Sequence, residues 1–199
     1  MKNILTFVFC VFCLFTSSAV SQGSMTVAGV TFDNTVKVGG SALVLNGAGV
    51  RTKQLFKIYA AGLYLTSNKT TTADVLSLGG AKRVKMVILR DLDSNSFASG
   101  FTTAFNNNNS SVERTRIFSS ITQFNALFAT VPVLKKGDVI TLDWVPGKGL
   151  QCTRNDRAVG NDINDAAFYQ ALLKVWLGDR AVETALKTAL LRGNPEGSR

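Results

Sequence analysis

The chain has 199 residues, of which 46% are hydrophobic and 18% charged, a composition that suits one globular domain and excludes a disordered or low-complexity chain. Lysine and arginine outnumber aspartate and glutamate by 22 to 13, and the formal net charge of +9 favours anionic partners. The basic residues are scattered along the chain, so nucleic acid is not an expected partner.

The first 21 residues have the pattern of a signal peptide. Lys2 precedes an apolar run over residues 4–15, and small residues follow it. We expect cleavage after Ala19 or Ser21 and export to the periplasm or the medium. A retained anchor is the weaker alternative, because a helix that spans a bilayer needs ~20 apolar residues. Residues 22–199 then form a single domain without a transmembrane anchor.

Short apolar stretches separated by glycines follow over residues 27–65, as expected of twisted strands joined by tight turns. Strands are predicted at 55–65, 84–89, 139–145 and 150–153. The sequence Pro-Gly-Lys-Gly at 146–149 predicts a hairpin between the last two strands. Together these strands predict an antiparallel sheet.

Helical periodicity appears in several later segments. Phe97, Phe101 and Phe105 are four residues apart and predict a helix that begins near Ser94 or Ser96. Further helices are predicted around Ile117, Ile121, Phe124 and Phe128, from near Asn164 to Gly178, and over 181–191. The run 106–109 with the two serines after it is interpreted as a solvated turn. The layout is α+β, an antiparallel sheet with helices packed on one face.

Missing residue types exclude several kinds of chemistry. The chain has no histidine, which excludes Ser-His-Asp and Cys-His catalysis and histidine metal sites. Cys152 alone remains after signal cleavage, and its apolar context favours a core residue over a nucleophile. No glycine-rich phosphate loop follows a predicted strand, so neither a metal nor a cofactor is expected. Asp91 and Asp93 form the closest carboxylate pair, for which capping and solvation are favoured over glycosidase-like catalysis.

One predicted strand combines basic, phenolic and small residues. Arg51 lies shortly before Tyr59, which shares a strand face with Ala61, Leu63 and Leu65. A guanidinium group binds a carboxylate through two hydrogen bonds, and a phenol adds a third donor, so the pair suits the mouth of an apolar pocket. The alternative is a surface arginine and an edge tyrosine without a shared ligand.

The same strand resembles a motif of the chalcone isomerase family, K-x-(T/Y)-A-x-G-(V/L)-Y-L, preceded by an arginine. Here the motif runs from Lys57 to Leu65, and Arg51 precedes it. The segments 84–89, 138–153 and 163–178 resemble later strands and a helix of the family, so the similarity extends over about 27–193. The resemblance implies an open-faced β-sandwich with helices over one side.

The resemblance also implies a site. In the plant enzyme an arginine, a threonine, a tyrosine and an asparagine position the chalcone for ring closure. Arg51 matches the arginine and Tyr59 takes the threonine position, whereas Phe97 and Ala104 stand where the family has the tyrosine and the asparagine. Two polar groups of the catalytic set are therefore absent. The combination of Arg51 and Tyr59 resembles instead the noncatalytic, fatty-acid-binding plant members.

These considerations predict an exported, noncatalytic protein that binds a fatty acid or a similar small amphipathic anion. Arg51 and Tyr59 would hold the head group, and Leu63, Phe97 and Phe101 would line the site. One alternative is an intramolecular lyase or isomerase of the chalcone isomerase type, with Arg51 and Tyr59 as its catalytic residues. A second is a noncatalytic partner or assembly protein that retains only the fold. The oligomeric state is not predicted.

Overall fold

The computed structural model describes residues 23–129 and 133–192. The predicted signal peptide at 1–21 lies outside these residues. None of the helices in the described ranges is long and apolar enough to cross a membrane.

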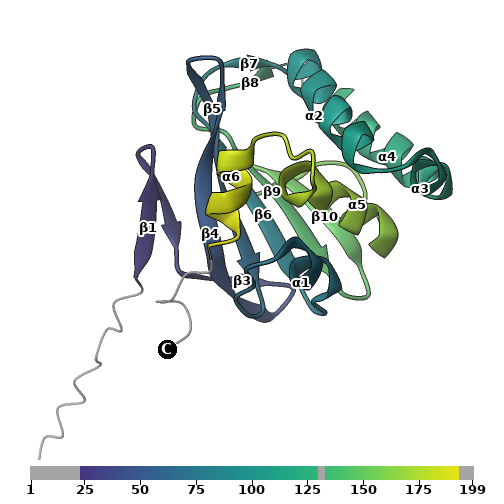
Figure 1. Ribbon diagram of the computed structural model, residues 1–199, viewed down its shortest axis with the longest axis horizontal. Helices are drawn as coiled ribbons and strands as arrows, with labels where there is room; N and C mark the ends of the chain where they lie inside the picture. The colour runs from purple at the N-terminus through teal and green to yellow at the C-terminus, as the bar shows by residue number, and fades with distance from the viewer. Residues whose placement is uncertain (1–22, 130–132, 193–199) are drawn as a thin grey trace, which may run out of the picture.

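A seven-stranded sheet forms the centre of the molecule (Figure 1), and all neighbouring strands in it are antiparallel, as predicted. The strand order is β11-β10-β9-β6-β5-β4-β3. The strands are β3 (Thr35–Val38), β4 (Ser41–Lys53), β5 (Phe56–Leu65), β6 (Lys82–Ile88), β9 (Val139–Val145), β10 (Gly149–Arg154) and β11 (Arg157–Ala158). The four strands predicted by position are all present, within two residues of the predicted ends.

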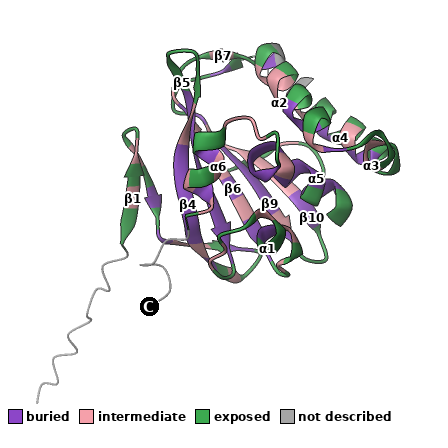
Figure 2. Ribbon diagram, viewed as in Figure 1, coloured by how far each residue is buried: buried purple, intermediate pink, exposed green. Residues whose placement is uncertain are grey.

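The helices pack on one face of this sheet, which confirms the predicted α+β layout. They are α1 (Thr72–Ser77), α2 (Ser94–Asn108), α3 (Ser111–Arg116), α4 (Phe118–Ala129), α5 (Ala166–Leu177) and α6 (Thr184–Leu190). The main core lies between sheet and helices and includes Leu63 and Met86 from the strands and Phe124 and Trp176 from α4 and α5. Figure 2 shows α5 buried at the centre of this layer.

Two further pairs of strands lie outside the central sheet. The hairpin of β1 (Ser24–Val27) and β2 (Val30–Asp33) places Phe32, which is fully buried, against the sheet face that the helices leave open. A Cβ atom on Gly62 of β5 would lie 2.7 Å from the Phe32 ring, so this contact depends on a glycine. The second pair joins β7 (Leu92–Asp93) and β8 (Val133–Leu134).

Side-chain caps fix the ends of the predicted helices. Asp93 accepts a hydrogen bond from the Ser96 backbone N–H at the start of α2, and Asp165 accepts one from the Phe168 N–H at the start of α5. α5 ends at Gly178, as predicted. The helix predicted over 181–191 is present but shorter, since α6 begins at Thr184.

The prediction of a solvated turn over residues 106–109 is wrong. α2 continues through Asn108, and Asn109 at its end is buried. The side-chain amide of Asn108 donates to the backbone oxygen of Ala104, and that of Asn109 donates to Phe105, one of the last four carbonyls of α2. The turn is therefore confined to Asn109 and Ser110, and Ser110 caps α3.

Candidate functional site

A cavity of about 660 Å³ opens between the end of β4, one side of α2 and the segment that precedes α6. This volume lies in the usual range for small-molecule sites, roughly 300–1,000 Å³. Its walls combine cations, hydroxyl groups and small side chains. They are formed by Arg51, Lys53, Ser96, Ser99, Gly100, Thr103, Ala104, Asn107, Arg180, Ala181 and Val182.

Arg51 occupies the inner wall of the cavity. It lies directly opposite Tyr59 in the pairing of β4 with β5, and its guanidinium carbon is 6.0 Å from the centre of the Tyr59 ring. The Arg51 Nε atom is buried and has no hydrogen-bond partner among the described residues. Because a buried donor without an acceptor is costly, this atom is suited to receive an oxygen of a ligand.

Two more cations, Lys53 and Arg180, share the cavity wall with Arg51. No carboxylate belongs to that wall, and none of the three cations forms an ion pair within the described ranges. The nearby Glu183 carboxylate accepts a hydrogen bond of 2.6 Å from the Thr52 backbone N–H. The cavity is therefore electropositive, and its charges are available to an anion.

α2 contributes a polar stripe to the opposite wall. Ser99 and Gly100 lie three and four residues after Ser96, and Thr103 lies three residues after Gly100, which places the four on one helical face. A Cβ atom built on Gly100 would meet nothing within 4 Å, so the wall is open at this point. The hydroxyl groups of Ser96 and Ser99 can donate to an anion that Arg51 holds, whereas that of Thr103 already donates to the Ser99 backbone oxygen at 2.9 Å.

Tyr59 lies beneath the cavity rather than in its wall. Its hydroxyl oxygen accepts a hydrogen bond of 2.9 Å from Trp176 Nε1, and the side chain is almost fully buried. Burial raises the pKa of Tyr59 to about 12, although the charge of Arg51 and the hydrogen bond from Trp176 act in the opposite direction. The structure thus brings Arg51 and Tyr59 together but directs the phenol oxygen toward the core.

The other predicted site residues belong to the aromatic core under α2. Phe97 packs edge-on against Tyr59 with ring centres 6.2 Å apart, and Phe101 packs against Trp176 at 6.0 Å. Leu63 is buried on β5. None of these three side chains is part of the cavity wall, whereas Ala104 is. Their contact with a ligand stays a prediction.

Most of the α2 stripe and Arg180 were not predicted as site residues. Ser96, Ser99 and Thr103 alternate with the phenylalanines of the same helix, so the stripe could have been found as the polar face opposite an aromatic one. Arg180 could not have been found in this way. Its position depends on how the segment after α5 returns to the end of β4.

The carboxylates proposed as a possible acid/base pair have structural roles. Asp93 caps α2, and Asp91 accepts hydrogen bonds from the backbone N–H of Lys136 and the side chain of Lys135, both at 2.9 Å. These bonds lower the pKa of Asp91. Capping accounts for Asp93, as the sequence favoured, and Asp91, for which solvation was favoured, forms an ion pair with Lys135.

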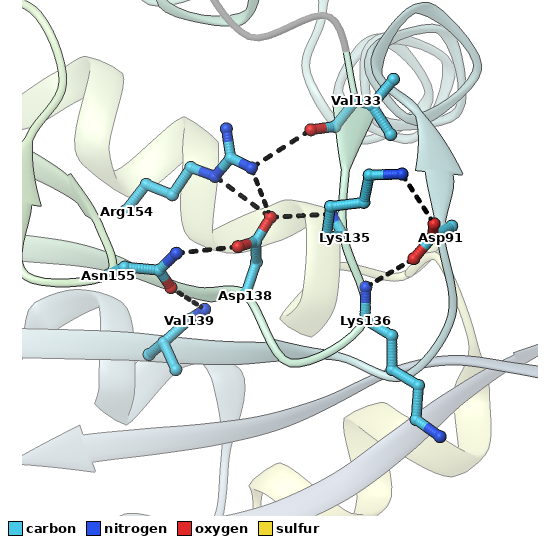
Figure 3. A network of polar contacts seen from close by, with 8 residues as sticks. All are labelled: Asp91, Val133, Lys135, Lys136, Asp138, Val139, Arg154 and Asn155. Atoms are coloured by element: carbon cyan, nitrogen blue, oxygen red, sulfur yellow. Dashed lines mark hydrogen bonds and ion pairs between the residues drawn. The ribbon is translucent and has the colours of Figure 1, made fainter.

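Asp138 forms a larger network beside Asp91 (Figure 3). Its carboxylate accepts hydrogen bonds from Arg154, Asn155 and the backbone N–H of Lys135 at 2.6 to 3.1 Å. Burial alone would raise the pKa of Asp138, but these donors together hold it below its usual value. The network joins the start of β9 to the end of β10 and holds no open position for a substrate.

Cys152 lies half-buried against the main core, as the sequence suggested. Burial raises the pKa of its thiol to about 12, which keeps the thiol protonated at neutral pH.

Comparison with known proteins gives a family and a fold. A family model described as chalcone isomerase-like matches residues 24–192. The crystal structure of a fatty-acid binding protein of Arabidopsis thaliana superposes with a TM-score of 0.69, at 17% sequence identity, over 85% of this chain and 96% of that one. No curated protein sequence matches the chain. At this identity the superposition shows a common fold.

Proposed function

We propose that this chain, which belongs to the chalcone isomerase-like family, binds a fatty acid or a similar small amphipathic anion without transforming it. The observation that carries the proposal is the cavity in which Arg51, Lys53 and Arg180 meet without a carboxylate partner. An anionic head group at Arg51 would accept from its buried Nε atom and receive further hydrogen bonds from the α2 stripe.

The apolar part of the ligand has two places to lie. The cavity itself offers Gly100, Ala104, Ala181 and Val182, which suit a short chain. The aromatic residues below it are already packed against one another, so a long tail that reaches Phe97 requires α2 to move away from the sheet. We therefore expect short-chain carboxylates to bind without a structural change and long-chain acids to bind with one.

The noncatalytic part of the proposal rests on the groups around the cavity. Its wall contains no carboxylate and no phenol among the described residues, and Tyr59 is bonded to Trp176. Proton transfer needs a titratable group within hydrogen-bond reach of the substrate. Arg51 alone could stabilise an enolate, which is the basis of the isomerase alternative. The name of the Arabidopsis protein supports fatty acids as the first ligands to test.

The decisive experiment measures ligands on the purified protein. Bound acids are extracted and identified by mass spectrometry, and the affinities of octanoate and palmitate are measured by calorimetry. Arg51→Ala is expected to weaken binding at least tenfold, since it removes a charge-assisted contact of about 1.5–3 kcal/mol. Arg157→Ala, at an exposed position on β11, is the matched control and should bind as the parent does.

Three results would contradict the proposal. Equal affinity of Arg51→Ala and Arg157→Ala for octanoate and palmitate would show that the ligand binds outside the cavity. Turnover of naringenin chalcone that Arg51→Ala abolishes would favour the isomerase alternative. The absence of both ligand binding and turnover would favour the alternative of a noncatalytic partner or assembly protein.

Export is also proposed, from the pattern of residues 1–21. Mass spectrometry of the protein recovered from cells tests it. An N-terminus at Val20 or Gln22 is expected, and a chain that keeps Lys2 would refute it.

A further inference from the structure

The hairpin that joins β4 to β5 ends in two exposed apolar side chains. Leu55 is 94% exposed and Phe56 is 54% exposed, although both belong to residue types that are usually buried. Gln54 in the turn adopts a positive φ of 56°, so the chain reverses within two residues and leaves Leu55 at the apex. In Figures 1 and 2 this hairpin extends past the sheet, and its end is exposed. Residues 53–57 are called the hairpin tip below.

Basic residues surround the hairpin tip. Lys53 and Lys57 flank the apolar pair, and the guanidinium carbon of Arg90 lies 4.2 Å from the centre of the Phe56 ring. Residues 51–59 include no aspartate or glutamate. The Glu183 carboxylate lies behind the tip, bonded to the Thr52 backbone N–H, and Asp91, next to Arg90, is paired with Lys135. The tip therefore has exposed apolar side chains within a positively charged rim.

We propose that the hairpin tip docks on an anionic phospholipid surface. Aliphatic and aromatic side chains favour the boundary between head groups and acyl chains, and flanking lysine and arginine residues pair with lipid phosphates. Arg90 can keep its contact with the Phe56 ring while its charge reaches the head groups. The charge rim is what favours a lipid surface over an apolar groove of a protein partner.

Docking through the hairpin tip would also place the cavity close to the membrane surface. Arg51 and Lys53 lie on the same strand end as the tip and form part of the cavity wall, so a docked tip brings that wall near the head groups. The docking proposal does not depend on the proposed function, because Leu55 and Phe56 are exposed whether or not the cavity holds a ligand.

Vesicle flotation of the protein recovered from cells tests the proposal. Vesicles contain phosphatidylcholine alone, or phosphatidylcholine with roughly one quarter phosphatidylglycerol. We expect binding to the anionic vesicles only, with weaker binding at high salt. The double variant L55S/F56S should bind at least about tenfold less. Lys57→Gln should bind about fivefold less, the value expected for one cation at an anionic surface.

The matched control is V112S/F118S, which removes two other exposed apolar side chains, 61% and 69% exposed, on α3 and α4. It should bind anionic vesicles as the parent does. All variants should keep the parent's melting temperature, because neither pair contributes to the core. Since parent and variants share one N-terminus, the comparison isolates the tip.

Three results would overturn the proposal: no binding of the parent to anionic vesicles, equal binding of L55S/F56S, or a loss of binding in V112S/F118S instead. A concentration-dependent dimer that L55S/F56S abolishes, without vesicle binding, would assign the tip to a second copy of the chain. Loss of vesicle binding in L55S/F56S with unchanged affinity for octanoate would support docking separately from ligand binding.

Discussion

Tyr59→Phe distinguishes the role that the sequence suggests for this residue from the one that the structure gives it. If the phenol oxygen faced the ligand, its removal would weaken binding. In the structure the oxygen accepts a hydrogen bond from Trp176 Nε1 within the core. The substitution keeps the ring, so its packing against Phe97 is retained and only the hydrogen bond is lost.

The expected cost follows from the burial of both partners. Trp176 is 1% exposed, so its indole N–H cannot turn to water when the acceptor is removed. An unsatisfied buried donor costs about 1–3 kcal/mol. At about 2 kcal/mol, the melting temperature of a domain of this size falls by about 4–8 °C. The affinity for a carboxylate at Arg51 should change less than twofold, because Tyr59 does not form part of the cavity wall.

The assay combines thermal unfolding with calorimetry of octanoate binding. Tyr64→Phe is the matched control, because Tyr64 is fully buried and its hydroxyl has no hydrogen-bond partner in the described part of the chain. Removal of the Tyr64 hydroxyl should leave the melting temperature at the parent's value or raise it. The double variant of Tyr59→Phe and Trp176→Phe should lose less unfolding free energy than the sum of the two single variants, since it leaves neither buried polar group without a hydrogen-bond partner.

The structural interpretation of Tyr59 fails if Tyr59→Phe melts at the parent's temperature while its affinity for octanoate falls tenfold. That combination would place the phenol oxygen on the ligand, as the sequence suggested.

Three further predictions concern the cavity and the titratable groups. Gly100→Leu should fill the cavity beside its open wall and abolish octanoate binding. Calorimetry of unfolding should show equal or higher stability, because glycine costs about 1 kcal/mol within a helix. An unchanged affinity for octanoate would refute the site. The pKa of Tyr59 is raised from 10.0 to about 12. The protonated phenol therefore contributes up to about 3 kcal/mol to the free energy of unfolding below pH 10, and this contribution is lost as the pH rises through 12. In urea unfolding at alkaline pH, Tyr59→Phe should lose less stability than the parent. Asp138→Asn should cost about 2–3 kcal/mol in urea unfolding, because Arg154 loses its charged partner, and a cost near zero would contradict the network in Figure 3.

The fold could be predicted from the sequence where patterns are long. The strand 139–145 was predicted to the residue, and the helix that ends at Gly178 carries both a capping aspartate and a terminal glycine. α1 was missed because it has six residues and a single buried one, Val75, which is too short for a period to appear. The asparagines that end α2 were misinterpreted, because their side chains bond to backbone oxygens of α2 itself and of Ala171 and Arg180, 62 and 72 residues away in sequence.

The candidate site was predictable only in part. The motif around Tyr59 placed Arg51 correctly beside it, because two strands joined by a short hairpin must lie side by side. The direction of the phenol oxygen depends on Trp176, which is 117 residues away in sequence. Arg180 is still farther from Arg51 in sequence. Contacts between such positions are set by how α5 and the segment after it cross the sheet, which no local pattern encodes.

The availability of Arg51 follows from where α6 begins. Gly47, Gly49 and Arg51 lie on one face of β4, opposite Leu63, Ala61 and Tyr59. α6 covers the two glycines so closely that a Cβ on Gly49 would lie 2.7 Å from the Ala189 side chain. The helix begins at Thr184, directly after Glu183, whose carboxylate accepts a hydrogen bond from the Thr52 backbone N–H. Beyond that point α6 no longer covers the strand face, and Arg51 borders the cavity together with α2. A one-residue slip of β4 would turn Arg51 to the opposite face of the sheet, so the close packing of α6 on the glycines also maintains the charge of the site.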